Sequence, residues 1–325
     1  MSSFAPLASV KPCSKEQISD KQAIKFLLPV LSELRTKTSS INKKSPKAFK
    51  VDSIDAIYVD NALSDEECGI LRNLIDNTES NNSDLISFWN PVGRDNDDAR
   101  SFRDCNTIEI NCKEFGDLLW NRVKNYVDYL LKPIIISDKN DNNEDIETEM
   151  IGTWNAVTTN NDILLAKYPR NGHFAPHTDG RATHLFNRRS LYSIIVFLND
   201  IPLEEGGGTR FYSNDAVTKL HRDINNRWTS DRSLMTAEIE ACAGRMLIFE
   251  QSLVHEGVPS LVLPKYIIRS DVIFDRNPPI NVNEEAFSYY RKAEEVAEDG
   301  QVEESIRLFK KAFAMDKKLK EIMKQ

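Results

Sequence analysis

Two residues with metal-binding side chains lie two positions apart in His177-Thr178-Asp179. Side chains at positions i and i+2 of a β-strand point to the same face, so this imidazole and this carboxylate would converge on one point. Two ligands are too few for a tight metal site, so a third is needed. His255, which follows the strand-like segment GRMLIFE, is the best candidate.

Two histidines and one carboxylate on one face leave open coordination positions and form the facial triad that is typical of non-heme Fe(II) oxygenases. His173 is a rival ligand because it is close to His177 in the sequence, but four residues along a strand place it about two strand repeats away. His184 and His221 are expected around the site or at the surface.

A mainly β architecture would bring these distant residues together. From Trp154 to Phe274, short runs rich in Ile, Val, Leu, Phe and Tyr alternate with Gly, Pro and Asn. Several short strands separated by turn signals predict a sandwich or jelly roll. The charged stretch 213–235 interrupts this pattern, and we expect a long loop over the barrel there.

Helices are expected on both sides of the β region. Ser64 and Glu67 have the spacing of a capping box, ahead of an apolar stripe at helical spacing. Residues 280–325 predict a helical hairpin with Gly300 near the turn, which resembles a single tetratricopeptide unit and should pack on the barrel or on a partner. The predicted fold class is a double-stranded β-helix (jelly roll) with flanking helices and this C-terminal hairpin. Residues 1–50 are expected to form a partly disordered N-terminal arm.

Composition narrows the function classes. Lys+Arg is 42 and Asp+Glu is 50, giving a net charge of -8, which argues against nucleic-acid binding as the main function. No apolar run is long enough for a membrane span, and the N-terminus lacks the pattern of a secretory signal. The five cysteines form no CxxC pair, which indicates a reduced compartment without structural zinc. We therefore expect a cytoplasmic protein and leave a nuclear location open.

Several ordered motifs surround the candidate ligands: YPRNGHFAPHTD, EEGGGTRFY, GRMLIF, HEGVP and KYIIRSDVIF. With these motifs the sequence resembles the 2-oxoglutarate/Fe(II)-dependent dioxygenases, most closely the prolyl 4-hydroxylase-like branch, from about Ile54 to Arg276. The resemblance implies a dioxygenase domain over residues 51–279. It also implies Fe(II), the cosubstrates 2-oxoglutarate and O2, and ascorbate as an additional candidate cofactor.

The resemblance assigns roles by matching position. His177, Asp179 and His255 are implied to bind Fe(II) and to be the catalytic residues. The distal carboxylate of 2-oxoglutarate needs a cation, because an unpaired buried charge is costly. Lys265 and Arg269 compete for this role, and we favour Arg269 because a guanidinium can grip a carboxylate with two hydrogen bonds.

Two further residues are compared with the family pattern. Tyr168 is implied to hydrogen-bond the cosubstrate or to shape its pocket. Phe197 stands where some relatives carry a tyrosine for the cosubstrate carboxylate, so the sequence departs from the pattern there.

The activity implied by the family is hydroxylation of a C–H bond, plausibly in a prolyl residue of a protein, with release of succinate and CO2. One alternative is a hydroxylase of the same family that acts on a small molecule or amino acid. Another is a non-catalytic binding module on the same fold, in which the C-terminal hairpin docks a partner. The intact set of three ligands argues against the second alternative.

Overall fold

The computed structural model describes most of the chain, namely residues 30, 32, 34, 45–80, 90–92, 97–130, 133–137 and 148–323. The predicted arm over residues 1–50 thus lies mostly outside the described residues. Its last residues belong to β1 (Lys47–Val51), which pairs antiparallel with β2 (Ala56–Asp60). The larger sheet therefore begins within the segment predicted as the arm.

The remaining strands of the two main sheets follow in chain order: β3 (Asn90–Val92), β4 (Cys105–Asn111), β5 (Ile134–Ile136), β6 (Gly152–Thr159), β7 (Asp162–Tyr168), β8 (Phe174–His177), β9 (Thr183–Leu185), β10 (Arg188–Phe197), β11 (Thr209–Tyr212), β14 (Met235–Ile239), β15 (Met246–Glu250), β16 (His255–Gly257) and β17 (Lys265–Asn277). The α-helices are α2 (Asp65–Ser80), α3 (Asp97–Phe102), α4 (Lys113–Leu130), α5 (Glu284–Glu298), α6 (Val302–Met315) and α7 (Lys317–Ile322). Short 3-10 turns are η2 (Thr148–Met150), η3 (Leu203–Glu205), η4 (Asn214–Thr218) and η5 (Arg232–Leu234).

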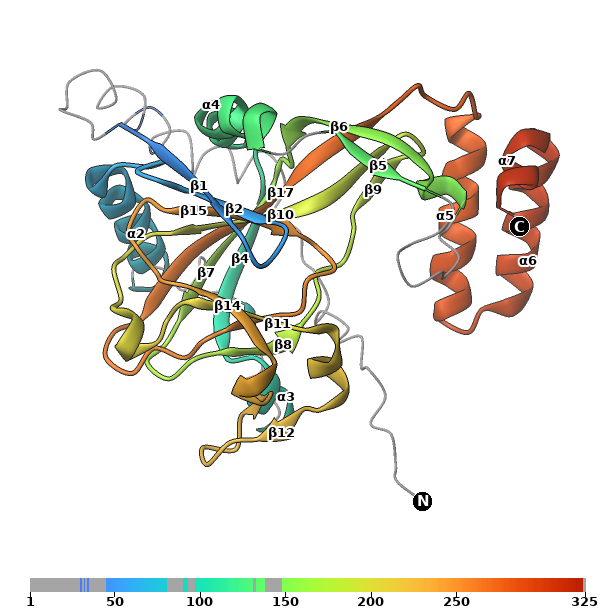
Figure 1. Cartoon of the computed structure of the whole chain (residues 1–325). Helices are drawn as coiled ribbons and strands as arrows, with labels where there is room; N and C mark the ends of the chain where they lie inside the picture. The colour runs from blue at the N-terminus through green and yellow to red at the C-terminus, as the bar shows by residue number, and fades with distance from the viewer. Residues whose placement is uncertain are drawn as a thin grey trace.

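The strands form two facing antiparallel sheets, as Figure 1 shows. The larger sheet runs β1-β2-β15-β10-β17-β7-β4-β3, and the smaller runs β14-β11-β16-β8. Apolar side chains from both fill the space between them; Phe211 of the smaller sheet lies edge-on to Phe249 of the larger, with ring centroids 5.1 Å apart. This arrangement is the double-stranded β-helix that the sequence predicted.

Helices α2 and α4 cover the outer face of the larger sheet, and their buried apolar residues join its core. The predicted capping box is confirmed: the Ser64 amide donates to Glu67 Oε2 at 2.7 Å, and the Glu67 amide donates to Ser64 Oγ at 3.2 Å. Helix α2 continues to Ser80. No described helix is both long enough and apolar enough to cross a membrane.

The charged stretch 213–235 is more ordered than the predicted loop. It contains η4, a two-stranded hairpin of β12 (His221–Arg222) and β13 (Trp228–Thr229), and η5. The Asp223 carboxylate accepts hydrogen bonds from both the backbone and the guanidinium of Arg227, which closes the hairpin turn. The prediction of a plain loop was wrong because such polar turn contacts leave no hydrophobic pattern.

The C-terminal helical hairpin is formed by α5 and α6, with Gly300 in the turn at a φ of +77°, where glycine is favoured. Helix α7 adds a third helix that was not predicted. The unit packs on the barrel, because Phe287 lies edge-on to the fully buried Phe186, with ring centroids 5.2 Å apart. The boundary between residues 279 and 280 remains a prediction.

Candidate metal centre

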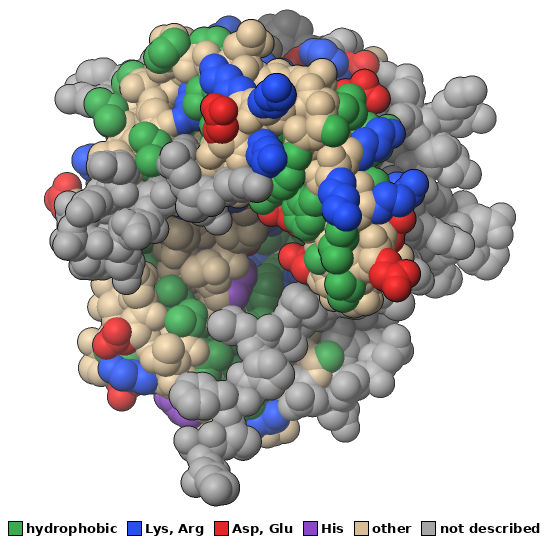
Figure 2. Space-filling model, turned by 90° about the vertical axis from the view of Figure 1, so that its right-hand side faces the viewer, with side chains coloured by type: hydrophobic (Ala, Val, Ile, Leu, Met, Phe, Trp, Pro, Cys, Tyr) green, Lys and Arg blue, Asp and Glu red, His purple; other side chains and the backbone are tan. Residues whose placement is uncertain are grey.

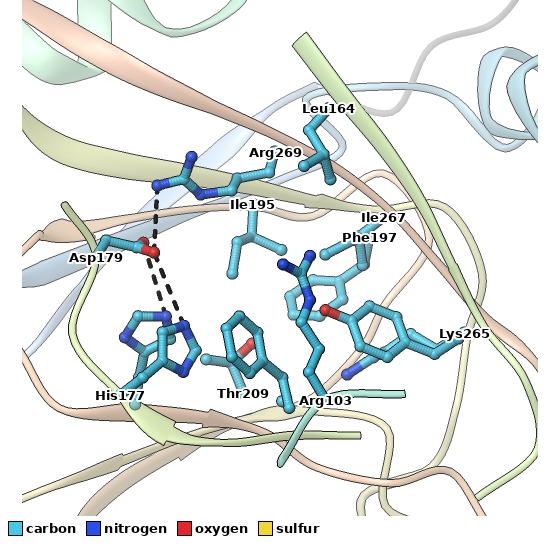
Figure 3. Close-up of a pocket in the computed structure, with 14 residues that line it drawn as sticks. Arg103, Leu164, His177, Asp179, Ile195, Phe197, Thr209, Lys265, Ile267 and Arg269 are labelled. Carbon is cyan, nitrogen blue, oxygen red and sulfur yellow. Dashed lines mark ion pairs between the residues drawn. The ribbon is translucent and has the colours of Figure 1, made fainter. Parts of the chain in front are cut away.

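The three predicted ligands meet at one end of the barrel. His177 ends β8 and His255 begins β16, and the two residues are direct partners across this antiparallel pair. Their Nε2 atoms lie 3.8 and 3.7 Å from the carboxylate oxygens of Asp179. All three ligand atoms are within 4.8 Å of one another, and Figure 3 shows the His177 ring beside the Asp179 carboxylate. The three groups are close enough to bind one ion together.

Backbone contacts orient both imidazoles for metal binding. His177 Nδ1 lies 2.7 Å from the Ala175 carbonyl oxygen, and His255 Nδ1 lies 3.0 Å from the Leu253 carbonyl oxygen. Each Nδ1–H can donate to its carbonyl, which leaves the lone pair of Nε2 directed at the centre. Burial lowers the pKa of His177 to about 3 and lowers the pKa of His255. Both rings are therefore neutral, as metal ligands must be.

The Asp179 carboxylate is held by its surroundings in the ionised form. It accepts a hydrogen bond from Ser193 Oγ, and an Arg269 guanidinium nitrogen lies 3.2 Å from its Oδ1. Burial alone would raise the pKa of Asp179, but the charge of Arg269 and the hydrogen bond from Ser193 help to bring it well below its ordinary value. Two neutral imidazoles and one ionised carboxylate are the ligand set of a facial triad, so these residues fit Fe(II).

A pocket extends from the three ligands into the barrel, with about 500 Å³ of empty space that includes its opening to solvent. Its walls are formed by Arg103, Leu164, Tyr168, Phe174, Ile195, Phe197, Thr209, Gly257, Lys265, Ile267 and Arg269. Figure 2 shows a hollow on one face of the molecule with a histidine side chain inside it.

The other three histidines lie apart from the centre. His173 is buried, and its Nε2 lies 2.8 Å from the Ser101 carbonyl oxygen. His184 and His221 are exposed. None of them belongs to the group of three close ligand atoms.

Lys265 and Arg269 have different surroundings. Lys265 is 2% exposed; its Nζ donates to the Val258 carbonyl at 3.3 Å and lies 4.5 Å from the centre of the Tyr168 ring. It pairs with no carboxylate in the part of the chain that the structure describes, and burial lowers its pKa to about 8. Arg269 instead lies 3.2 Å from Asp179 and 3.4 Å from Asp271. The charge of Arg269 is thus already compensated, whereas that of Lys265 is not.

Arg103 is a pocket residue that the sequence reasoning missed. Its guanidinium carbon lies 4.5 Å from the centre of the Phe174 ring, and Phe174 stacks on His177 with ring centroids 3.5 Å apart. A backbone bridge to Phe174 places Arg103 there, and no local pattern marks it. The predicted Tyr168 and Phe197 do line the pocket.

The fold and the site define a double-stranded β-helix with a His-Asp-His metal centre. Residues 163–270, about a third of the chain, match the model of the 2OG-Fe(II) oxygenase superfamily. The matched segment contains the three ligands and both candidate cations. Fe(II) and 2-oxoglutarate are therefore the cofactors, as the sequence motifs implied.

Solved structures with a similar fold include oxygenases of several kinds. A viral collagen prolyl hydroxylase from Paramecium bursaria Chlorella virus-1, in complex with 2OG, is 15% identical, covers 69% of this chain and 98% of its own, and has a TM-score of 0.40. A Pseudomonas putida prolyl-4-hydroxylase is 12% identical to this chain. The match covers 76% of this chain and 98% of the hydroxylase, with a TM-score of 0.41. The non-heme alpha ketoglutarate dependent epimerase SnoN from nogalamycin biosynthesis is 11% identical to this chain. The match covers 79% of this chain and 93% of the epimerase, with a TM-score of 0.41. No curated protein sequence matches the chain. These structural likenesses are too distant to assign a substrate.

Proposed function

We propose that this oxygenase hydroxylates a C–H bond, plausibly in a prolyl residue of a protein or peptide, and releases succinate and CO2. One observation carries the proposal: a single pocket has three metal ligands at one end and an uncompensated lysine in its wall. 2-Oxoglutarate has matching chemistry, because one end can chelate a metal and the other is a carboxylate. The prolyl substrate is supported by the motif resemblance alone.

The three ligands His177, Asp179 and His255 would hold Fe(II). When bound, the iron and 2-oxoglutarate supply the activation of O2 for substrate oxidation. In our proposal Asp179 keeps its hydrogen bond from Ser193 and its ion pair with Arg269 while it binds the metal. These contacts orient the carboxylate, as neighbouring groups commonly do in metal sites.

Lys265 is our choice for the distal carboxylate of 2-oxoglutarate, in place of the Arg269 favoured from the sequence. An ammonium group at 2% exposure without an acidic partner gains most from an incoming carboxylate. The Arg269 guanidinium is occupied by two carboxylates of the protein. Tyr168 would lie along the cosubstrate, since its ring already contacts the lysine.

Apolar side chains complete the proposed cosubstrate pocket. Ile195, Phe197 and Ile267 line it and are at most 8% exposed. They would exclude water and strengthen the charge pair with Lys265. Four described cysteines are unpaired, which supports the proposed cytoplasmic location.

The test is an anaerobic titration of the metal-free protein with Fe(II) and then 2-oxoglutarate, monitored for a metal-to-ligand absorption band. Succinate formation in air, and peptides that gain one oxygen atom by mass spectrometry, would follow. His177→Ala is the matched control that removes one ligand. If the wild-type protein gave no absorption band and no succinate, the non-catalytic binding module would replace this proposal.

A further inference from the structure

The pocket contains a second cation without an acidic partner. Arg103 lines it, and Figure 3 shows the guanidinium directed into the space among the lining residues. Its Nε donates to Cys105 Sγ at 3.2 Å, and its guanidinium lies over the Phe174 ring. In the described part of the chain Arg103 forms no ion pair with a carboxylate. Arg210 and Arg245, by contrast, pair with Glu238 and Asp60.

The proposed cofactors do not compensate this charge. The two charges of Fe(II) would be balanced by Asp179 and the metal-chelating carboxylate of 2-oxoglutarate. The distal carboxylate would balance Lys265, and Asp271 balances Arg269. The guanidinium of Arg103 is then left with one positive charge in a partly buried site, where an anion would stabilise it.

Arg103 lies toward the metal end of the pocket. Phe174 contacts both groups, because the Arg103 guanidinium lies 4.5 Å from the centre of its ring and the His177 ring stacks on it at 3.5 Å. A group bound beside the metal ligands is thus the natural partner of Arg103.

We propose that Arg103 binds a carboxylate of the substrate, close to the carbon that is oxidised, and so selects acidic substrates. This inference rests on the proposed function and narrows its substrate class. A guanidinium suits the role because it can donate two parallel hydrogen bonds to one carboxylate. The carboxylate could belong to a free amino acid or to an acidic residue in a peptide, and the two sources share this chemistry.

The experiment measures binding by calorimetry, without turnover, to anaerobic protein loaded with Fe(II) and 2-oxoglutarate. Two matched pairs of probes are used: L-proline against L-prolinamide, and acetyl-Pro-Glu-amide against acetyl-Pro-Gln-amide. We expect the acid of at least one pair to bind at least about tenfold more tightly than its amide. The pair that shows the preference identifies the source of the carboxylate.

Substitutions then test the residue. Arg103→Gln should abolish the preference for the acid and leave the 2-oxoglutarate affinity within about twofold, while Arg103→Lys should keep part of the preference. Arg170→Gln, a matched loss of charge at an exposed arginine that contacts the Leu261 carbonyl, should change neither. Thermal unfolding of each variant verifies the fold.

Three results would overturn the inference: equal binding or no binding of acid and amide in both pairs, a preference that survives in Arg103→Gln, or a large loss of 2-oxoglutarate affinity in that variant. The last result would assign Arg103 to the cosubstrate. Failure of the proposed function is distinguishable, because the wild-type protein would then not bind 2-oxoglutarate at all.

Discussion

His177 and His255 are partners in the same rung of the β8–β16 ladder, with ring centroids 4.2 Å apart. Residues opposite each other in an antiparallel pair have their side chains on the same face. The register of two short strands therefore fixes the geometry of two of the three ligands before any metal binds. Asp179 follows two residues after His177, and its position is set by the hydrogen bond from Ser193.

Removal of one imidazole should abolish metal binding while the fold remains. His177→Ala is expected to lower Fe(II) affinity by at least about 100-fold and to abolish succinate formation, because two ligands cannot hold the ion tightly. Metal binding is measured by anaerobic titration and the fold by circular dichroism. His184→Ala, at an exposed position, is the control. Turnover retained by His177→Ala would mean that the ligands are wrongly assigned.

The hydrogen bond from Ser193 to Asp179 should matter for the metal more than for the fold. Ser193→Ala is expected to lower Fe(II) affinity by about 10- to 100-fold, because the carboxylate loses one of the contacts that orient it. Ser288→Ala, which removes an exposed hydroxyl on α5, should leave the affinity unchanged. Equal affinities in the two variants would show that Arg269 alone positions Asp179.

Substitutions of Lys265 and of Arg269 should weaken the binding of different cofactors, namely 2-oxoglutarate and Fe(II). Lys265→Met is expected to weaken 2-oxoglutarate binding by about 30-fold or more, since loss of one partner of a buried charge pair costs about 2–5 kcal/mol. Arg269→Gln is expected to weaken Fe(II) binding first, because it frees Asp179 from its ion pair. Two titrations, one with each ligand, separate the effects. Small and equal effects of both variants on 2-oxoglutarate binding would exclude both cations.

The affinity for 2-oxoglutarate should fall at high pH. Burial lowers the pKa of Lys265 to about 8, and only the charged ammonium pairs with the distal carboxylate. The dissociation constant is therefore expected to rise up to about tenfold per pH unit above about pH 8. Anaerobic titrations between pH 7 and pH 9.5, values that bracket this pKa, measure the effect. Lys265→Arg is the control, because a guanidinium stays charged in this range; the same pH dependence in this variant would contradict the assignment.

The same lysine predicts how the stability of the empty protein depends on pH. Its pKa is lower in the folded chain than its ordinary value of 10.5, so above about pH 8 the unfolded chain binds more protons than the folded one. The free energy of unfolding should therefore rise with pH between these two values because of this group. Urea unfolding of wild-type protein and Lys265→Met across this window isolates the contribution.

The contact between α5 and the barrel should contribute to stability but not to cofactor binding. Phe287→Ala is expected to lower the free energy of unfolding by about 3 kcal/mol, because it leaves a cavity against the buried Phe186. Ile306→Ala, at a side chain that is 47% exposed, should cost much less. Urea unfolding measures both variants, and 2-oxoglutarate titration checks the pocket. A lost pocket in Phe287→Ala would mean that the helices are integral to the barrel.

The sequence predicted the features that depend on local patterns. The capping box of Ser64 and Glu67, the turn at Gly300 and the alternation of short strands each follow from neighbouring residues. The proximity of the three ligands followed from the motifs and from the strand periodicity. Fold class and cofactors could therefore be stated before the structure was known.

The features that the sequence did not predict depend on contacts between distant segments. Arg103 belongs to no motif and enters the pocket through a backbone bridge to Phe174. Arg269 was favoured for the distal carboxylate of 2-oxoglutarate because its guanidinium can donate two hydrogen bonds. The sequence did not show that Asp271 lies beside it and already pairs with it. The β12–β13 hairpin in the charged insertion is held by polar contacts in its turn. Such contacts cannot be predicted from hydrophobic periodicity.

The charged insertion 213–235 is hydrogen-bonded to Glu256, the residue that follows the metal ligand His255. Thr229 of β13 donates to Oε1 of the buried Glu256 at 2.9 Å, and Arg210 holds the other oxygen of that carboxylate at 3.2 Å. Glu256 shares a peptide bond with His255. The β12–β13 hairpin at the surface is thus joined, through the Glu256 carboxylate, to the same short strand that carries the ligand His255.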